Sequence, residues 1–179
     1  MSLRERIAAG AALLVLAGAS ARAADNPQFG TPVTQDDIAA WDISIGPDGA
    51  GLPPGRGTVA QGETVFAAKC QACHGEKGAG KPNDTLVGGA GSLEPGKTPV
   101  KTIGSYWPYA TTLFDYVRRA MPWDHPKSLT DQEVYDVSAY LLYLNGIIGQ
   151  DDVIDAQSLP KVTMPNRQGF ITFPRWPPK

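Results

Sequence analysis

The sequence predicts an all-α fold, a small helical domain with long irregular arms at both ends. Three stretches carry apolar side chains at helical spacing: residues 59–69, 111–120 and 128–145. The sequence has no internal repeat and no strand-rich region. Its 20 glycines and 16 prolines, which interrupt regular structure, concentrate before residue 62, between 75 and 108, and after residue 159.

The first 23 residues have the pattern of an export signal. Arg4 and Arg6 form a charged start, a short apolar run follows over residues 7–17, and Ala21-Arg22-Ala23 fits the small-x-small cleavage rule. The apolar run is shorter than the roughly 20 residues of a membrane-spanning helix, and no later stretch is apolar for long enough. We therefore expect cleavage after Ala23 and a soluble, exported protein, which in a bacterium lies in the periplasm.

The charge balance argues against a nucleic-acid partner. The chain carries 16 basic and 18 acidic residues, and removal of the signal takes away three arginines and one glutamate, which leaves a net charge of −4. Binding to phosphates requires a basic face. A docking patch for a protein partner remains compatible with this charge, because local patches matter more than the sum.

The two arms, residues 24–58 and 149–179, are predicted to be mostly extended. Thr34 can cap a short helix that runs to Trp41, and Gly46-Pro47-Asp48-Gly49 has the composition of a turn. Both arms hold large apolar side chains that a disordered linker would lack. We therefore expect the arms to pack on the domain or on a partner chain. These side chains are Trp41, Ile43, Ile45, Leu52, Ile154, Leu159, Phe170, Ile171, Phe173 and Trp176.

The first two predicted helices have recognisable features of packing and termination. Gly62, within residues 59–69, leaves room for the close approach of a second helix. Thr111 or Thr112 can cap the next helix, and Pro122 prevents its continuation.

The last predicted helix has the clearest ends. Thr130-Asp131-Gln132-Glu133 is a capping box, and Gly146 is typical of the position just after a helix. Between them, apolar residues recur at helical spacing, at Val134, Val137, Leu141 and Leu144.

The segment Cys70-Gln71-Ala72-Cys73-His74 carries the most specific chemistry. It reads C-x-x-C-H, the pattern for covalent attachment of a c-type haem, in which two thiols form thioethers and the histidine binds the iron. Three alternatives fit less well. A thioredoxin-like redox pair needs a βαβ setting, and a structural zinc site needs four ligands, whereas the chain has only two Cys and two His. A disulfide between cysteines three residues apart adds little stability.

The distal iron ligand has three candidates, because Met1 is removed with the signal. Met121 follows a predicted helix and lies 47 residues after His74, which is enough chain to pass around a haem edge. We expect Met121 to be the ligand, since a His–Met pair is a known axial set. Met164 on the C-terminal arm and His125 near Met121 are the alternatives.

Several other residues are expected to border the haem. Pro82 and Leu86 lie in a Gly-rich loop, from which a backbone carbonyl can accept the imidazole N–H of His74 and fix its tautomer. Trp107 and Tyr109 can contact a propionate or the haem edge through their N–H and O–H groups. For these two aromatic residues, packing in the core is the alternative.

These motifs together resemble the class I c-type cytochromes, over residues 59–148. The shared order is helix, C-x-x-C-H, loop, helix, Met and capped helix. The resemblance implies an all-α fold around one covalent haem c, with crossed first and last helices and with His74 and Met121 on the iron. One difference is visible: the family often has a compact G-x-G-P-x-L loop, whereas here Pro82 and Leu86 are further apart.

A closer resemblance includes the arms. It is to the SoxD family, the cytochrome subunits of periplasmic sulfane dehydrogenase. It implies a molybdenum-containing partner subunit of the SoxC type, which oxidises carrier-bound sulfane sulfur. Some members have a second haem domain, so this chain, with one C-x-x-C-H, corresponds to the one-haem part. The matching segments include Trp41-Asp42-Ile43, Gly46-Pro47-Asp48-Gly49, Leu86-Val87-Gly88-Gly89, residues 106–116 and Met164-Pro165-Asn166.

The favoured function is that of an electron-transfer subunit. A haem with both axial positions filled has no open site for a substrate, so it relays electrons and is not catalytic alone. The alternative is a free shuttle cytochrome that serves another periplasmic dehydrogenase or an oxidase. The long arms disfavour it, because a shuttle needs a small transient contact face. A haem enzyme such as a peroxidase would need a vacant or displaceable distal ligand.

Overall fold

The computed structural model of the protein describes residues 30–170. The chain divides between Asp42 and Ile43 into two compact units. The first has a single helix in its described part, and the other elements found in residues 30–170 all lie in the second. Some predictions fall outside the described residues: the signal at residues 1–23, and Ile171, Phe173 and Trp176 of the C-terminal arm.

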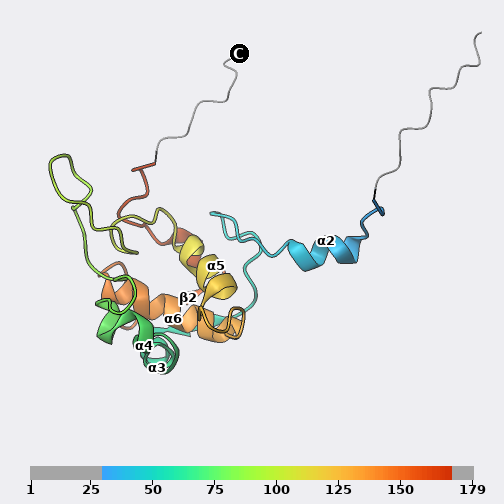
Figure 1. Cartoon of the computed structure of the whole chain (residues 1–179), viewed down its shortest axis with the longest axis horizontal. Helices are drawn as coiled ribbons and strands as arrows, with labels where there is room; N and C mark the ends of the chain where they lie inside the picture. The colour runs from blue at the N-terminus through green and yellow to red at the C-terminus, as the bar shows by residue number, and fades with distance from the viewer. Residues whose placement is uncertain (1–29, 171–179) are drawn as a thin grey trace, which may run out of the picture. The chain divides into compact units, whose positions relative to one another are not determined.

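Helices dominate the second unit, as the sequence predicted (Figure 1). Within residues 30–170 the single sheet is an antiparallel pair of three-residue strands. None of the helices in this range has the length and apolarity that a bilayer crossing requires. The elements are β1 (Arg56–Thr58), α3 (Val59–Lys69), α4 (Gln71–His74), the 3₁₀ turn η1 (Glu76–Gly78), α5 (Ala110–Ala120), α6 (Asp131–Leu144), β2 (Val153–Asp155) and the 3₁₀ turn η2 (Leu159–Lys161).

The first unit contains α2 (Gln35–Trp41), the short helix that was predicted after Thr34. The Thr34 hydroxyl accepts the Asp37 N–H at 3.1 Å, and the Asp37 carboxylate accepts the Thr34 N–H at 2.8 Å. This reciprocal pair is a capping box, which satisfies two N–H groups at the start of the helix.

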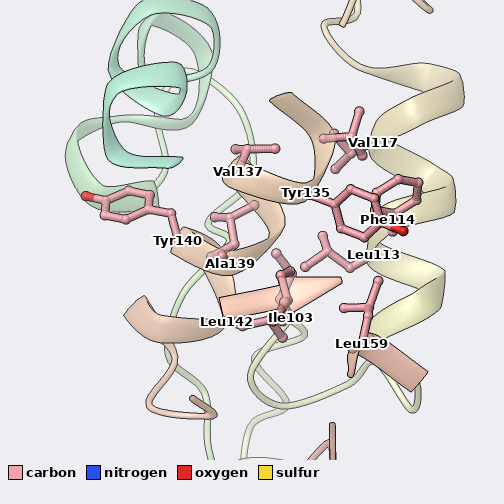
Figure 2. Packing of buried hydrophobic residues seen from close by; sticks show 14 of the residues in the cluster. Ile103, Leu113, Phe114, Val117, Tyr135, Val137, Ala139, Tyr140, Leu142 and Leu159 are labelled. Carbon is pink, nitrogen blue, oxygen red and sulfur yellow. The ribbon is translucent and has the colours of Figure 1, made fainter. Parts of the chain in front are cut away.

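Helix α6 lies between α3 and α5 and forms the centre of the fold (Figure 2). On the α3 side, a side chain at Gly62 would overlap the carbonyl oxygen of Asp136, so glycine permits the close approach that the sequence suggested. Phe66 of α3 packs against Tyr140 of α6, with ring centroids 5.5 Å apart.

The hydrophobic core fills the space between α5 and α6. Phe114 and Tyr135 are fully buried, and their ring centroids are 4.4 Å apart (Figure 2). The core extends to side chains from the segments before α3 and after α6, because Ile45, Ile154 and Leu159 are also buried in it.

The ends of α6 agree with the sequence analysis. Thr130 and Glu133 form the capping box, in which the Thr130 hydroxyl accepts the Glu133 N–H at 3.2 Å. At the other end Gly146 adopts a φ of 66° and donates to the Tyr143 carbonyl, while Ile147 donates to Leu142. This pair of bonds is the Schellman arrangement that closes helices before a glycine.

The predicted cap of α5 is wrong. The helix begins at Ala110, and its N-cap is Tyr109, which makes no side-chain capping bond. Thr111 therefore lies inside the helix, where it is 1% exposed, and its hydroxyl has no hydrogen-bond partner within the described residues. Burial of this face against the core fixes the helix start, and the local capping preference of threonine does not.

Much of the two arms packs on the helical domain. Strand β1 pairs with β2, so that Gly57 lies opposite Ile154 and the chain segments on either side of the helices are joined. Ile45, Leu159 and Met164 are buried in the core together with Ile154. Residues 43–58 and 149–164 therefore pack with the helices, which is one of the two outcomes expected for the arms.

Buried Tyr135 contributes to the stability of the fold, and this contribution is lost at alkaline pH. Its hydroxyl donates to the Pro53 carbonyl at 2.9 Å, and burial, reinforced by the nearby Asp155 and Asp131 carboxylates, raises the pKa of Tyr135 to about 12. The folded state therefore favours the neutral phenol, and this contribution is complete below about pH 10 and lost as the pH rises towards 12.

We expect the wild type to lose more free energy of unfolding than Tyr135→Phe between about pH 9 and pH 11. Urea denaturation at both pH values measures this difference, and the other tyrosines contribute equally to both proteins. Equal losses would show that the Tyr135 phenol ionises as readily in the folded protein as in the unfolded chain.

Candidate haem-binding site

The C-x-x-C-H segment forms one short turn at the end of α3. Cys70 lies between the two helices, as the C-cap of α3 and the N-cap of α4, and its carbonyl accepts the His74 N–H at 3.0 Å. Cys70 is half-buried and Cys73 is exposed, and neither is in a disulfide. The turn therefore presents two free thiols and an imidazole from five consecutive residues.

The thiol chemistry argues against a redox-active pair. Burial raises the pKa of the Cys70 thiol to about 11, whereas a C-x-x-C redox motif depends on a thiol whose pKa is lowered. In the described range, residues 30–170, no cluster of three or more His, Cys, Asp or Glu side chains is arranged to hold a metal ion.

The ring of His74 is held by the loop that follows it. Its Nδ1 lies 2.9 Å from the carbonyl oxygen of Asp84, so the N–H at this position donates and Nε2 is left as the metal-binding nitrogen. The sequence predicted that a backbone carbonyl of this loop would accept the His74 N–H, and the structure shows that the acceptor is the carbonyl of Asp84.

Backbone hydrogen bonds hold the loop that follows His74, residues 75–86, against the C-x-x-C-H turn. This segment is called the proximal loop below. The Gly80 N–H donates to the His74 carbonyl at 2.7 Å, and the Asn83 N–H donates to the Cys73 carbonyl at 2.9 Å. Gly75 begins the loop with a φ of 75°, and a side chain there would overlap the carbonyl oxygen of Gly80. The loop thus binds back to the last two residues of the motif, and this fixes the direction of the imidazole.

The three candidates for the distal ligand lie in different environments. Met121 caps the C-terminus of α5, is half-buried and packs against the core. Met164 is 1% exposed within the core, packed among apolar side chains. His125 is exposed, and its Nδ1 lies 3.2 Å from the carboxylate of Asp124.

Trp107 and Tyr109 precede α5 and make different contacts. Trp107 is half-buried and packs edge-to-face with Tyr116 of α5, with ring centroids 5.6 Å apart. The guanidinium carbon of Arg167 lies over the ring of Tyr109, 4.2 Å from the ring centroid. Tyr109 also lines a hollow of about 620 Å³, together with Pro160 and other arm residues. Tyr109 thus contacts Arg167 of the C-terminal arm, and residues of both arms line the hollow beside it.

Two comparisons identify the family. Residues 59–145 match the cytochrome c family. The structure is also similar to a chain of the crystal structure of the sulfane dehydrogenase SoxCD from Paracoccus pantotrophus, with 42% identity and a TM-score of 0.74, over 82% of this chain and 72% of that chain. The chain belongs to the class I c-type cytochromes. Within this family the cytochrome is close to SoxD.

A second relative is the thiosulfate dehydrogenase of Psychrobacter arcticus. It is 28% identical to this cytochrome over 112 residues, which are 57% of this chain. The matched region is 32% of that protein, so the cytochrome spans about a third of the length of this curated relative.

The donor set of the cytochrome fits the covalent haem c of its family. The two thiols lie on one turn, and His74 has one ring nitrogen engaged by Asp84 and the other available. The half-buried thioether of Met121 supplies a second candidate ligand outside the polar loop. The cytochrome is accordingly an electron carrier that binds haem c.

Two residues that organise this site were not predicted from the sequence. Asp84 contributes through its backbone carbonyl, which no side-chain pattern reveals. Asn145, the C-cap of α6, donates to the Leu86 carbonyl at 3.2 Å and accepts the Gly88 N–H at 3.1 Å. It therefore ties the end of the proximal loop to α6. In the sequence, an Asn directly before the helix-ending glycine indicates a helix end, but it does not indicate that its side chain binds a distant loop.

Proposed function

We propose that this cytochrome is the mono-haem, SoxD-like electron-transfer subunit of a periplasmic, molybdenum-dependent sulfane dehydrogenase that acts in the oxidation of sulfur compounds such as thiosulfate. The observation that carries the proposal is the extent of the likeness to SoxCD. It takes in 82% of this chain, whereas the cytochrome c match takes in residues 59–145, fewer than half of the 179. The likeness therefore includes arm segments that a general cytochrome would not share.

The geometry of the C-x-x-C-H turn and the engaged Nδ1 of His74 support the haem roles proposed for individual residues. Cys70 and Cys73 would hold the haem through thioethers, and His74 and Met121 would bind its iron. Pro82, Trp107 and Tyr109 are proposed to border the haem. When bound, haem c supplies the one-electron ferric/ferrous couple.

The protein's own contribution is to orient and tune these ligands. The Asp84 carbonyl holds the Nδ1–H of His74, which fixes the tautomer and increases the basicity of Nε2. Met121 contributes a thioether, which stabilises the ferrous state relative to a second imidazole. With His74 and Met121 both bound to the iron, no site would be open to a substrate, so the subunit would transfer electrons and the sulfur substrate would be oxidised on the partner.

Covalent attachment through Cys70 and Cys73 can be tested on the purified holoprotein. We expect acid–acetone to leave the haem with the denatured chain, because thioether bonds survive unfolding. Cys70→Ala with Cys73→Ala should give a protein from which any bound haem is extracted. Free haem in the extract of the wild type would contradict the thioether assignment.

Co-expression with a molybdenum subunit of the SoxC type tests the function. We expect the two chains to co-purify, and we expect the cytochrome haem to be reduced when a sulfane substrate is added to the complex. A cytochrome that never co-purifies with such a subunit, yet is reduced by other periplasmic dehydrogenases, would instead be a free electron shuttle.

Analysis of the mature N-terminus tests export, with cleavage expected after Ala23.

A further inference from the structure

Helix α2 exposes an apolar face. Val33, Ile38 and Trp41 are 72%, 43% and 86% exposed, respectively, and all three line one shallow hollow on the helix. Val33 precedes the N-cap Thr34, and Ile38 is the fourth helical residue, which is the spacing of a hydrophobic staple. Apolar side chains of this size are more usual in a core or an interface than in water.

The helix is well formed but short. It has seven residues, a complete capping box and no buried residue. Isolated helices shorter than roughly 12 residues are marginal in water, so capping alone does not explain a stable α2. A helix that is organised in this way and whose apolar face is open is typical of a segment that docks into a groove.

Other parts of the arms already have a role in this molecule. Ile45, Ile154, Leu159 and Met164 are buried in the core, and strands β1 and β2 pair with each other. These segments hold the helical domain together. Helix α2, described by itself, has no buried residue, which distinguishes it from these segments.

The charge of the helix indicates what kind of surface it fits. Residues 30–42 contain Asp36, Asp37 and Asp42 and no Lys or Arg. Asp37 is used in the capping box, and the other two carboxylates have no hydrogen bond or ion pair within the described residues. A complementary surface is therefore an apolar groove whose edges carry Lys or Arg side chains.

We propose that α2 is the anchor by which this cytochrome binds its catalytic partner subunit, with Ile38 and Trp41 inserted in an apolar groove that basic side chains border. The inference rests on the proposed function, because it takes the partner to be a subunit of the SoxC type. It assigns different roles to the two arms: residues 43–58 and 149–164 stabilise the domain, and residues 33–42 bind the partner.

The test uses the full-length holo-cytochrome and the purified SoxC subunit of the Paracoccus pantotrophus enzyme, with affinity measured by calorimetry. We expect Ile38→Ala with Trp41→Ala to weaken binding at least about 10-fold, since aromatic and aliphatic anchors dominate interfaces. Val100→Ala is the matched control, because Val100 is 40% exposed but lies in the other unit. It should change the affinity by less than about twofold.

Two further measurements report on the same contact. Backbone amides of residues 37–42 should gain protection from hydrogen exchange when SoxC is added. Asp36→Asn with Asp42→Asn should reduce the dependence of affinity on salt. All variants should keep the midpoint potential of the wild type, which shows that the haem site is intact.

The outcomes separate this inference from the proposed function. If the wild type binds SoxC and the Ile38/Trp41 variant binds equally well, the α2 inference is wrong and the proposed function stands. If the wild type does not bind SoxC at all, the proposed function is contradicted, and the inference is contradicted with it.

Discussion

Gly62→Val is expected to destabilise the folded cytochrome by at least about 3 kcal/mol, an effect at the upper end of those seen for overpacking. A side chain at residue 62 would overlap the Asp136 carbonyl oxygen and crowd the β-carbon of Tyr140. Both obstacles belong to α6 close to its backbone, so neither can rotate away as the tip of a flexible side chain could. Relief requires α3 and α6 to separate, which would disturb the Phe66–Tyr140 contact.

Urea unfolding of the holoprotein, followed by circular dichroism, measures this loss. Ala60→Val is the matched control, because it places the same β-branched side chain at an exposed position of the same helix. The control measures the cost of a valine without overpacking, and helix propensity does not explain a loss at residue 62, because valine is a better helix former than glycine. Similar unfolding free energies for the two variants would mean that α3 and α6 are not packed as closely as the structure indicates.

Local patterns were sufficient to predict most of the helical framework. The bounds of α3, the Thr34 cap of α2 and the capping box of α6 follow from a few neighbouring residues, and the capping hydrogen bonds are themselves local. The β1–β2 pair was missed because it joins residues about a hundred positions apart, with Arg56 opposite Asp155, and each strand is only three residues long. Such short strands have no alternating pattern that could be recognised.

At the haem-binding site, too, the side-chain motif was predictable from the sequence and the backbone geometry was not. The C-x-x-C-H motif and the need for a carbonyl beside His74 could be read from residue types. The identity of that carbonyl, Asp84, depends on how the longer loop folds back on Cys73 and His74, and every residue has a carbonyl to offer. The prediction that Thr111 caps α5 was wrong because burial of Thr111 against the core outweighed the local preference of threonine for the cap position.

Partner recognition is the feature least accessible from sequence. The large apolar residues of the arms were noticed as a group, but their composition did not separate those that complete the core from those that remain exposed. Ile45 and Ile154 are buried, whereas Trp41 is 86% exposed. The structure is needed for this distinction, because residue type alone does not separate the two groups.

Met121→Ala is expected to lower the midpoint potential by on the order of 100 mV, since axial ligands set haem potentials over a range of about 0.8 V. Loss of the thioether removes a ligand that favours the ferrous state and leaves one axial position open to carbon monoxide or cyanide. Potentiometric titration and ligand-binding spectra measure the two effects. Met121 occupies the end of α5, where it is half-buried, so its removal should disturb the packing little.

Two variants make this result specific to ligation. Met121→His should also lower the potential but still exclude carbon monoxide, because a second imidazole fills the position. Met164→Leu alters the core at a residue that is 1% exposed, and it should leave the potential and the ligand-binding spectra unchanged. If Met164→Leu opens the iron and Met121→Ala does not, the distal ligand is Met164. In that case the C-terminal arm, which the core holds through Met164 and Leu159, would itself complete the haem site.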